Sequence, residues 1–500
     1  MIDQSLLDYD FDEEGEGFGE PESAPGVSVS APRSGGEVLG LIAVLIGAVS
    51  LGLQSLTGVL NDTWIGFLSA YGGLMLGGSL YFIASYARTL AGIKHDGTWF
   101  NKALARGLLG WIAGLGMTAL YIALYFYPGA IGYQPALWGS EGMISAGYVT
   151  GGMVASVGPL ARLAGNENSQ WYLYGVLYTG SILLFGVRMF MRYRHNRYHL
   201  IRTASVMGFQ TIFAWYLPNL LSKLNKPYIE FNGVWPLKKE YLWPEKVSSE
   251  WAGSGFGTFL TVFAIAGVIA TPILTYFYGK RWYCSWVCGC GGLAETLGDP
   301  WRQLSDKSTR AWKLERFSIH AVLILVLITT AFLWVDFGSS GNAYGSWSAK
   351  YKEWYGFYIG AVFSGVVGVG FYPLLGSRVW CRFGCPQAAI LGLWQRLFSR
   401  FRITTNGGQC MSCGNCSTYC EMGIDVRAYA QRSENIVRAS CVGCGVCAAV
   451  CPRGVLQLAN GDPGDRYEGA DKPLADLVAS LKGTDIYGYK GWDPSAPSDD

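Results

Sequence analysis

Long apolar stretches separated by short polar connections dominate the chain between residues 38 and 376. Eight stretches approach or exceed the roughly 20 residues that a helix needs to cross a bilayer. They are 38–60, 64–87, 103–127, 171–191, 202–222, 255–279, 317–337 and 355–376. The pattern predicts a mostly α-helical, polytopic membrane bundle of about eight transmembrane helices.

Composition supports this membrane interpretation. Half of the residues are hydrophobic and only 15% are charged, whereas soluble domains carry about 25% charged residues. The 19 Trp and 30 Tyr suit interfacial belts, and the 68 Gly suit close helix packing in lipid. No basic tract with interleaved aromatic residues indicates a nucleic-acid partner.

Lysine and arginine gather in every second connection, as expected for helices that cross a bilayer in alternating directions. The basic connections follow the second, fourth, sixth and eighth stretches. This distribution predicts a bacterial cytoplasmic (inner) membrane protein with both termini in the cytoplasm. The loops 128–170 and 223–254 then face the other side, the first with a re-entrant or surface segment near 142–160. The second loop is either a docking site for an extracytoplasmic partner or a plain connection.

All 13 cysteines lie between residues 284 and 451, and eight of them form two runs of equal spacing. The runs are Cys410-x-x-Cys413-x-x-Cys416-x-x-x-Cys420 and Cys441-x-x-Cys444-x-x-Cys447-x-x-x-Cys451-Pro452. In bacterial two-cluster ferredoxins this spacing supplies thiolates for [4Fe–4S] cubes, and the fourth cysteine of each run ligates the other cube. The spacing predicts one cluster held by Cys410, Cys413, Cys416 and Cys451, and another held by Cys441, Cys444, Cys447 and Cys420.

Tetrahedral zinc is the alternative for paired C-x-x-C motifs, but a zinc site has no use for an evenly spaced third cysteine. The first run departs from the ferredoxin pattern because Glu421 follows Cys420, whereas Pro452 follows Cys451. A less rigid loop is expected at Glu421.

A second set of cysteines marks an internal repeat at the ends of the sixth and eighth apolar stretches. The segments 279–288 and 376–385 share the pattern G-x-R-x-aromatic-C-x-aromatic-x-C at an offset of 97 residues. Cysteines four apart lie on one face of a helix, so each copy is expected to direct two thiols the same way. If the copies pack as a pseudo-symmetric pair, Cys284, Cys288, Cys381 and Cys385 converge.

Three interpretations of these four cysteines remain open: a third iron–sulfur cluster, a redox-active dithiol or disulfide pair, and buried structural thiols. Cys290 has no counterpart in the second copy, where Gln387 stands. It either replaces Cys288 as a ligand or is a bystander. Arg281 and Arg378 are interpreted as residues that anchor the helix ends at the cytoplasmic face of the membrane, or else as residues that stabilise an anionic cluster or a quinone head group.

Other chemistry has little support in the sequence. His195, His199 and His320 form no opposed pair for a haem and are interpreted as solvated or interfacial histidines. No G-x-G-x-x-G after a strand and no P-loop indicates a nucleotide site. The chain offers no group suited to acid–base or nucleophilic catalysis.

The expected organisation has five parts. Residues 1–36 form a disordered acidic tail, 37–200 a four-helix membrane region, and 201–400 a duplicated two-hairpin membrane region that carries the C-x-x-x-C motifs. Residues 401–460 form a domain for two [4Fe–4S] clusters, and 461–500 a polar tail with a short helix candidate at 473–482.

Membrane hairpins that end in C-x-x-x-C, followed by a double ferredoxin run, resemble the polyferredoxin-type membrane electron-transfer proteins, the group of NapH, NosR and CcoG. The resemblance covers roughly residues 200–455, and Cys381-x-x-x-Cys385-Pro386 matches the C-x-x-x-C-P motif of the group fully. The first copy departs from it, since Gly289 and Cys290 follow Cys288. The four stretches before residue 200 exceed the minimal NapH pattern.

The resemblance implies electron transfer between a quinone pool or a cytoplasmic donor and a partner redox protein. It implies a subunit of a larger membrane complex, such as a quinol dehydrogenase. The alternative is a redox-linked accessory or assembly protein for another metalloenzyme.

Overall fold

A computed structural model gives the fold of the chain. It describes residues 33–88, 108–134, 137–139, 142–144, 147–148, 152–226, 229, 231, 233, 235–244, 255–341 and 343–461. Most of the two predicted tails, and the helix candidate at 473–482, lie outside the described residues.

Helices make up most of the described chain, and each predicted apolar stretch falls on helical structure. The long helices are α1 (Gly35–Thr57), α3 (Gly73–Ala87), α5 (Leu108–Phe126), α7 (Gln170–Arg192), α8 (Arg197–Phe209), α10 (Gly255–Tyr278) and α13 (Thr309–Gly338). Wider π-helical turns extend three segments: η2 (Leu68–Gly72) joins α2 (Trp64–Phe67) to α3, η6 (Gln210–Tyr216) joins α8 to α9 (Leu217–Lys223), and η10 (Tyr355–Gly370) follows α14 (Ser346–Trp354) and precedes α15 (Tyr372–Leu375).

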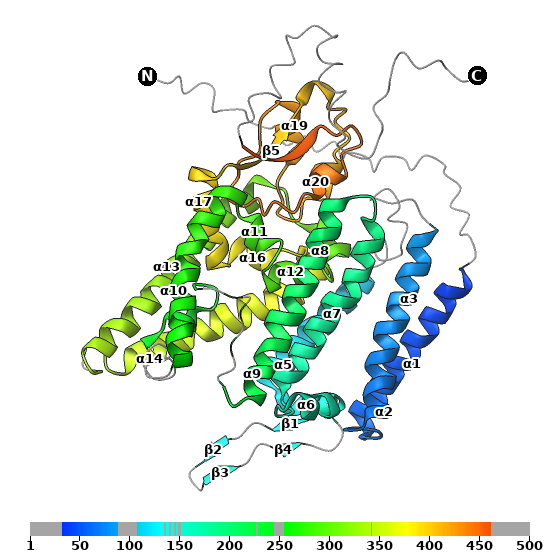
Figure 1. The fold of residues 1–500 in the computed structure, drawn as a ribbon, viewed down its shortest axis with the longest axis vertical. Coiled ribbons are helices and arrows are strands. Elements are labelled where there is room, and N and C mark those ends of the chain that lie inside the picture. The colour runs from blue at the N-terminus through cyan, green and yellow to red at the C-terminus, as the bar shows by residue number, and fades with distance from the viewer. Residues whose placement is uncertain are drawn as a thin grey trace.

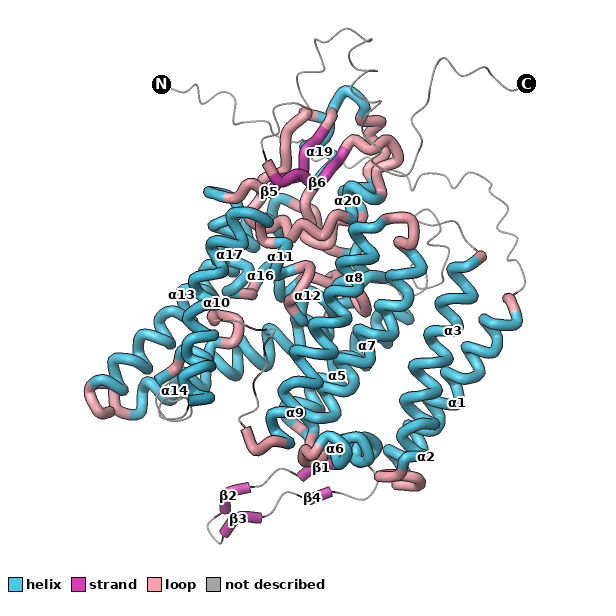
Figure 2. The backbone as a smooth tube through the Cα atoms, in the orientation of Figure 1, coloured by secondary structure: helices cyan, strands magenta, loops and turns pink. Residues whose placement is uncertain are grey.

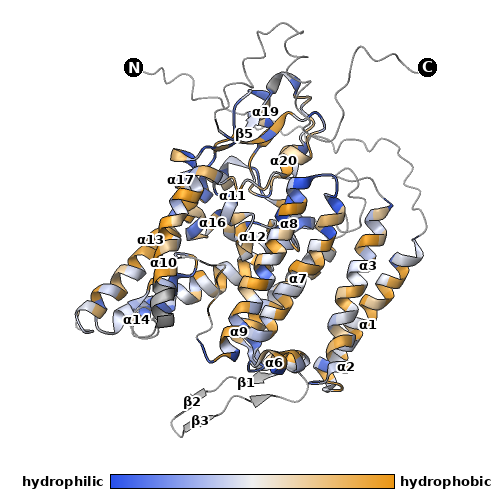
Figure 3. Ribbon diagram, viewed as in Figure 1, coloured by the Kyte–Doolittle hydropathy of each residue, from blue (hydrophilic) through white to orange (hydrophobic). Residues whose placement is uncertain are grey.

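Four of these segments are long and apolar enough to cross a membrane: Gly35–Thr57, Trp64–Ala87, Gln170–Arg192 and Thr309–Gly338. Apolar side chains such as Leu45, Ile273 and Phe317 point away from the protein on α1, α10 and α13, and Figure 3 shows apolar residues along the bundle helices. The mostly helical fold class is therefore confirmed, and the number of eight crossings stays a prediction.

A cysteine-rich domain, residues 401–460, caps one end of the bundle, opposite the short strands β1 (Tyr133–Gln134), β2 (Leu137–Gly139), β3 (Gly142–Ile144) and β4 (Gly147–Tyr148) (Figure 1). The Tyr198 hydroxyl donates to the Gly443 carbonyl at 3.0 Å, so the basic connection between α7 and α8 lies at the capped end. At the other end, the Asn166 side chain after α6 (Gly158–Ala164) donates to Asn219 of α9 at 2.7 Å. The described connections thus alternate between the two ends, and the choice of cytoplasmic end stays a prediction.

The segment near 142–160, expected to be re-entrant or on the surface, is irregular where it is described. It contains β3, β4 and η5 (Met153–Val157), and it runs into α6. β1 pairs with β4 and β2 pairs with β3, in both cases antiparallel. η4 (Pro128–Ile131) precedes β1, and η7 (Lys239–Leu242) lies in the later loop.

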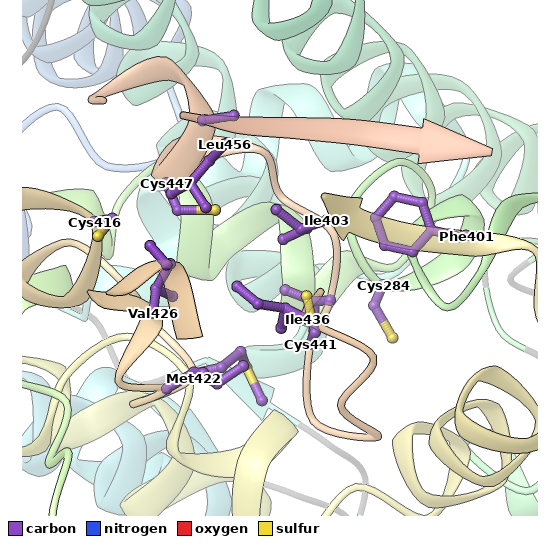
Figure 4. Packing of buried hydrophobic residues seen from close by; sticks show 14 of the residues in the cluster. Cys284, Phe401, Ile403, Cys416, Met422, Val426, Ile436, Cys441, Cys447 and Leu456 are labelled. Carbon is purple, nitrogen blue, oxygen red and sulfur yellow. The ribbon is translucent and has the colours of Figure 1, made fainter. Parts of the chain in front are cut away.

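The cysteine-rich domain is closed by an antiparallel pair, β5 (Phe401–Thr405) and β6 (Leu456–Asn460), shown side by side in Figure 2. Between them lie η11 (Gly407–Gln409) and three short helices, α18 (Asn415–Thr418), α19 (Val426–Gln431) and α20 (Val446–Ala449). Figure 4 shows Ile403, Val426, Ile436 and Leu456 packed among the cysteines of this domain.

This core extends into the membrane bundle. It includes Tyr283 and Cys284 of α11 (Arg281–Cys284) and Leu391 of α17 (Pro386–Phe398). α12 (Gly289–Glu295), η9 (Asp299–Leu304) and α16 (Val379–Phe383) complete this layer between the long helices and the cysteine-rich domain. The domain is therefore built onto the bundle and is not a separate body on a tether.

Close packing of α1 against α3 depends on glycine, as small-residue interfaces in membranes do. A Cβ atom at Gly47 would lie 2.7 Å from the Ala70 carbonyl oxygen, whereas a Cβ atom at Gly52 of the same helix meets nothing within 4 Å. Replacing Gly47 with valine is expected to separate the two helices and destabilise the fold by about 1–3 kcal/mol. Thermal unfolding in detergent measures this, with Gly52→Val as the matched control. Equal midpoints for the two variants would contradict the packing argument.

Candidate metal centres

One set of four cysteines lines a hollow on the outer side of the cysteine-rich domain, here called the outer cavity. Its lining contains Cys410, Cys413, Cys416 and Cys451, together with Pro452. α18 carries Cys416, and its preceding Gly414 has a φ of 75°, which glycine adopts without strain. Burial raises the pKa of the Cys416 thiol to about 11, so metal binding at pH 7 must release its proton.

A second set lines a hollow that faces the bundle, here called the inner cavity. Its lining contains Cys420, Cys441, Cys444 and Cys447. Cys420 thus lies with the cysteines of the second run, and Cys451 with those of the first. Burial raises the pKa of the Cys441 thiol to about 11. This exchange of the fourth cysteine is the arrangement found in two-cluster ferredoxins.

The geometry does not favour zinc. A single metal ion needs its ligands to converge on one point, and among the described residues no three Cys, His, Asp or Glu side chains do so. A cube instead binds each thiolate at a separate iron corner, which a ring of four cysteines around a cavity permits.

The repeat cysteines depart from the expected helical geometry. Cys284 ends α11 and Cys288 is the N-cap of α12; in the second copy Cys381 lies in α16 and Cys385 is the N-cap of α17. The prediction that each pair shares one helix face is therefore wrong. The amide of the second cysteine reaches back five residues, from Cys288 to Tyr283 at 2.8 Å and from Cys385 to Trp380 at 2.9 Å, and this tight turn ends the first helix.

The two copies nevertheless bring their thiols together. Cys284, Cys288, Cys381 and Cys385, here called the repeat thiols, are all buried. The Cys385 thiol interacts electrostatically with the other three. A hydrogen bond from the Cys290 thiol lowers the pKa of Cys288, so Cys290 adjoins the group. The structure thus brings five sulfur atoms near one another.

Between the repeat thiols and the inner cavity lies a group of charged side chains that sequence reasoning missed, here called the buried ion network. It consists of Arg188, Arg192, Arg202, Arg302 and Arg378 with Glu295, Asp299 and Glu421, each at most 3% exposed. Asp299 pairs with Arg188, Arg192 and Arg302. Burial alone would raise the pKa of Asp299, but these three arginines outweigh burial and lower it.

Glu421 connects the cysteine-rich domain to this network. Its carboxylate lies 2.9 Å from Arg302 and 3.0 Å from Arg378, as charge contacts rather than aligned hydrogen bonds. Burial would raise the pKa of Glu421, but Arg302 and Arg378 lower it. Two arginines thus hold the residue that stands in place of proline, and the looser loop expected at this position stays a prediction.

Arg378 lies beside the repeat thiols, where a residue that stabilises an anionic cluster would be needed. Its guanidinium donates to the Cys284 carbonyl at 3.2 Å and lies 3.6 Å from the Cys381 sulfur. Arg281, its counterpart in the first copy, instead stacks on the Phe401 ring at 4.6 Å. The two arginines therefore have different roles despite their equivalent positions.

Histidine placement needs one correction. His195 is exposed, but His199 is only 1% exposed and stacks on Tyr193 with ring centroids 4.5 Å apart. Burial, together with Arg202 and Arg302, lowers the pKa of His199 well below its usual range. His199 is a neutral packing residue beside the network and is not a solvated one.

Comparison with known families supports iron–sulfur binding in both regions. A 4Fe–4S binding domain family matches residues 260–308 and 358–404, which contain the two repeat copies. A 4Fe–4S dicluster domain family matches residues 409–456, which contain both ferredoxin runs. The prediction of [4Fe–4S] clusters is confirmed.

Two curated proteins are similar to part of the chain. YccM of Escherichia coli (strain K12), an electron transport protein by name, is 26% identical over 154 residues, or 29% of this chain and 43% of YccM. MauN of Methylobacillus flagellatus, a methylamine utilization ferredoxin-type protein by name, is 25% identical over 195 residues, or 38% of this chain and 62% of MauN.

The chain thus spans less than two thirds of the length of either relative. No solved structure is significantly similar to it. The family matches, the relatives and the two cysteine-lined cavities agree with the polyferredoxin resemblance. The chain thus contains 4Fe–4S binding domains, and parts of it are similar to an electron-transport protein and to a ferredoxin-type protein, which is consistent with the polyferredoxin type.

Proposed function

We propose that the chain relays electrons through three [4Fe–4S] centres, between a quinone pool or a cytoplasmic donor and a partner redox protein. Cys410, Cys413, Cys416 and Cys451 would hold the first centre, Cys420, Cys441, Cys444 and Cys447 the second, and the repeat thiols the third. One-electron carriage is the chemistry that such centres supply when bound.

The observation that carries the proposal is the unbroken succession of the three sets of thiols. The Cys447 thiol of the inner cavity interacts electrostatically with Cys416 of the outer cavity. On its other side, Glu421 follows the inner-cavity ligand Cys420 and pairs with Arg378, which contacts Cys381. Neighbouring sets are thus one or two side chains apart, as a relay requires.

Charge supports a centre at the repeat thiols. In the described part of the network, five arginines face three carboxylates, and the buried Lys280 adds a further positive charge beside Cys284 and Cys381. Excess positive charge in a buried site is costly unless anions offset it. Thiolate-ligated centres on both sides of the network would supply that negative charge.

Position supports the proposed donor and setting. The repeat thiols lie where apolar helices end, which favours a lipid-soluble quinone as the donor. Basic connections gather at the capped end of the bundle, which favours a cytoplasmic location for the cysteine-rich domain. We assign the chain to a larger complex in the bacterial cytoplasmic membrane, with further redox subunits as its partners.

Iron content tests the third centre. Anaerobically purified wild-type protein is expected to hold about twelve irons per chain, as three cubes require, and Cys381→Ser or Cys385→Ser to hold about eight. Cys290→Ser is the matched control and is expected to keep about twelve, since Cys290 is a neighbour and not a ligand here. Iron and acid-labile sulfide assays give the numbers, with EPR of the reduced protein. About eight irons in the wild type would overturn the third centre.

A further inference from the structure

One arginine of the buried ion network contacts both a repeat thiol and the carboxylate that follows an inner-cavity cysteine. Arg378 is 1% exposed, and its Nη1 atom lies 3.6 Å from the Cys381 sulfur. Its Nη2 atom lies 2.6 Å from Glu295 and 3.0 Å from Glu421, the neighbour of Cys420. Its guanidinium thus donates a hydrogen bond to a repeat thiol.

The local backbone is shaped around this contact. Gly291 lies near the start of α12, three residues after Cys288, and a Cβ atom there would meet the Cys284 carbonyl oxygen at 2.0 Å and Arg378 Nη1 at 3.0 Å. Any larger residue would displace the guanidinium or the carbonyl that it binds. The glycine thus keeps open the space in which the guanidinium contacts the first repeat copy.

We propose that Arg378 sets the reduction potential of the centre held by the repeat thiols, and that it does so as a positioning residue rather than as a ligand. Its fixed positive charge stabilises the additional negative charge of the reduced centre, and burial strengthens this attraction relative to water. Hydrogen bonds to the sulfurs and net local charge are among the properties that set the potentials of iron–sulfur centres. The inference rests on the proposed third centre.

The positive charge of Arg378 raises the reduction potential of the repeat-thiol centre. The centre is therefore easier to reduce than the same centre would be in an apolar surrounding. Through Glu421, whose charge it balances, the same guanidinium also adjoins the inner cavity. Reduction of one centre is therefore expected to make the other harder to reduce, because the two share one counter-charge.

An EPR-monitored redox titration of the whole protein in detergent tests the proposal. The signal to follow is the one that disappears in Cys381→Ser. In Arg378→Gln, which keeps a hydrogen-bond donor but loses the charge, its midpoint potential is expected to fall by about 59 mV or more, a tenfold change for a one-electron couple. Arg378→Lys keeps the positive charge, and its midpoint potential is expected to stay close to that of the wild type.

Arg382 provides the matched control. It lies in α16, of which Arg378 is the N-cap residue, is also buried, and pairs with Glu315 at 2.7 Å. Arg382→Gln therefore loses a buried ion pair without touching a sulfur, and is expected to leave the potential unchanged. An equal shift in Arg382→Gln, or no shift in iron-replete Arg378→Gln, would overturn the proposal.

Iron content separates the remaining outcomes. If Arg378→Gln loses about four irons while Arg378→Lys keeps them at the wild-type potential, the charge itself is required and the proposal stands. If Arg378→Lys loses the same irons, Arg378 is a structural residue and the proposal fails. A wild-type protein with about eight irons refutes the third centre itself, independently of any Arg378 variant.

Discussion

Replacing Glu421 with alanine is expected to weaken the attachment of the cysteine-rich domain by about 3–5 kcal/mol, the usual cost of removing one partner from a buried ion pair. The variant leaves Arg302 and Arg378 facing each other without the carboxylate that both contact. The inner cavity adjoins this position, so its iron is expected to be lost first. Amide hydrogen exchange across residues 401–460 and iron content measure the two effects.

Glu434 is the matched control for this change, because it is a glutamate in the same domain whose ion pair is exposed. It pairs with Arg432 at 3.0 Å, and both side chains are more than half exposed. Glu434→Ala is expected to cost only about 0–1 kcal/mol and to leave hydrogen exchange unchanged. Similar protection in the two variants would show that Glu421 does not anchor the domain.

Asp299→Asn is expected to have the largest effect on stability. The substitution leaves three buried arginines, Arg188, Arg192 and Arg302, without their shared carboxylate. The cost should exceed that of a single broken pair, about 3–5 kcal/mol, and most of the stability of an ordinary domain is then lost. Immunoblots of the membrane fraction are expected to show little accumulated protein.

The pH dependence of this contribution follows from the lowered pKa of Asp299. A carboxylate with a lowered pKa stabilises the fold fully when the pH is above the ordinary carboxyl pKa of about 3.9, and it loses that stabilisation as the pH falls.

Asp62→Asn is the control for Asp299→Asn, since Asp62 pairs with Arg162 at the surface. This variant is expected to accumulate normally. Normal accumulation of Asp299→Asn would contradict the central position given to the network.

The sequence predicted those features that depend on local patterns. Apolar runs located the helices, because the length of a run is visible without knowledge of its neighbours. Cysteine spacing grouped Cys420 with the second run and Cys451 with the first, as the cavities have them, because this exchange is built into the ferredoxin spacing.

The buried ion network could not be predicted in the same way. Arg192 and Arg202 lie at helix ends in basic connections, where such residues ordinarily extend to the membrane interface. The partner of Arg192, Asp299, is 107 residues away in the chain, so the pair exists only after the helices have packed. Substitution of Glu421 for the usual proline was the one visible signal, and it was interpreted as a loss of rigidity.

The helix-face prediction for the repeat failed for a different reason. Helical periodicity was extended across residues 284–288 and 381–385 as though each segment were one helix. In the second copy Gly384 precedes Cys385, and glycine is a poor continuation of a helix; in the first copy α11 ends at Cys284 and Gly289 begins α12. The break turns the second thiol of each copy toward its partner copy, a convergence that two straight helices need not produce.

The core that Phe401 and Ile403 share with Tyr283 and Leu391 bears on how the protein is made. Tyr283 leaves the ribosome well before the strand that ends at Asn460, so the last domain can complete its interior only against hairpins already inserted in the bilayer. A fragment of residues 401–460 made alone would expose that apolar surface and leave Glu421 without Arg302 and Arg378. Loading of the [4Fe–4S] clusters is thus expected to follow membrane insertion, because the cysteine-rich domain folds against the inserted bundle.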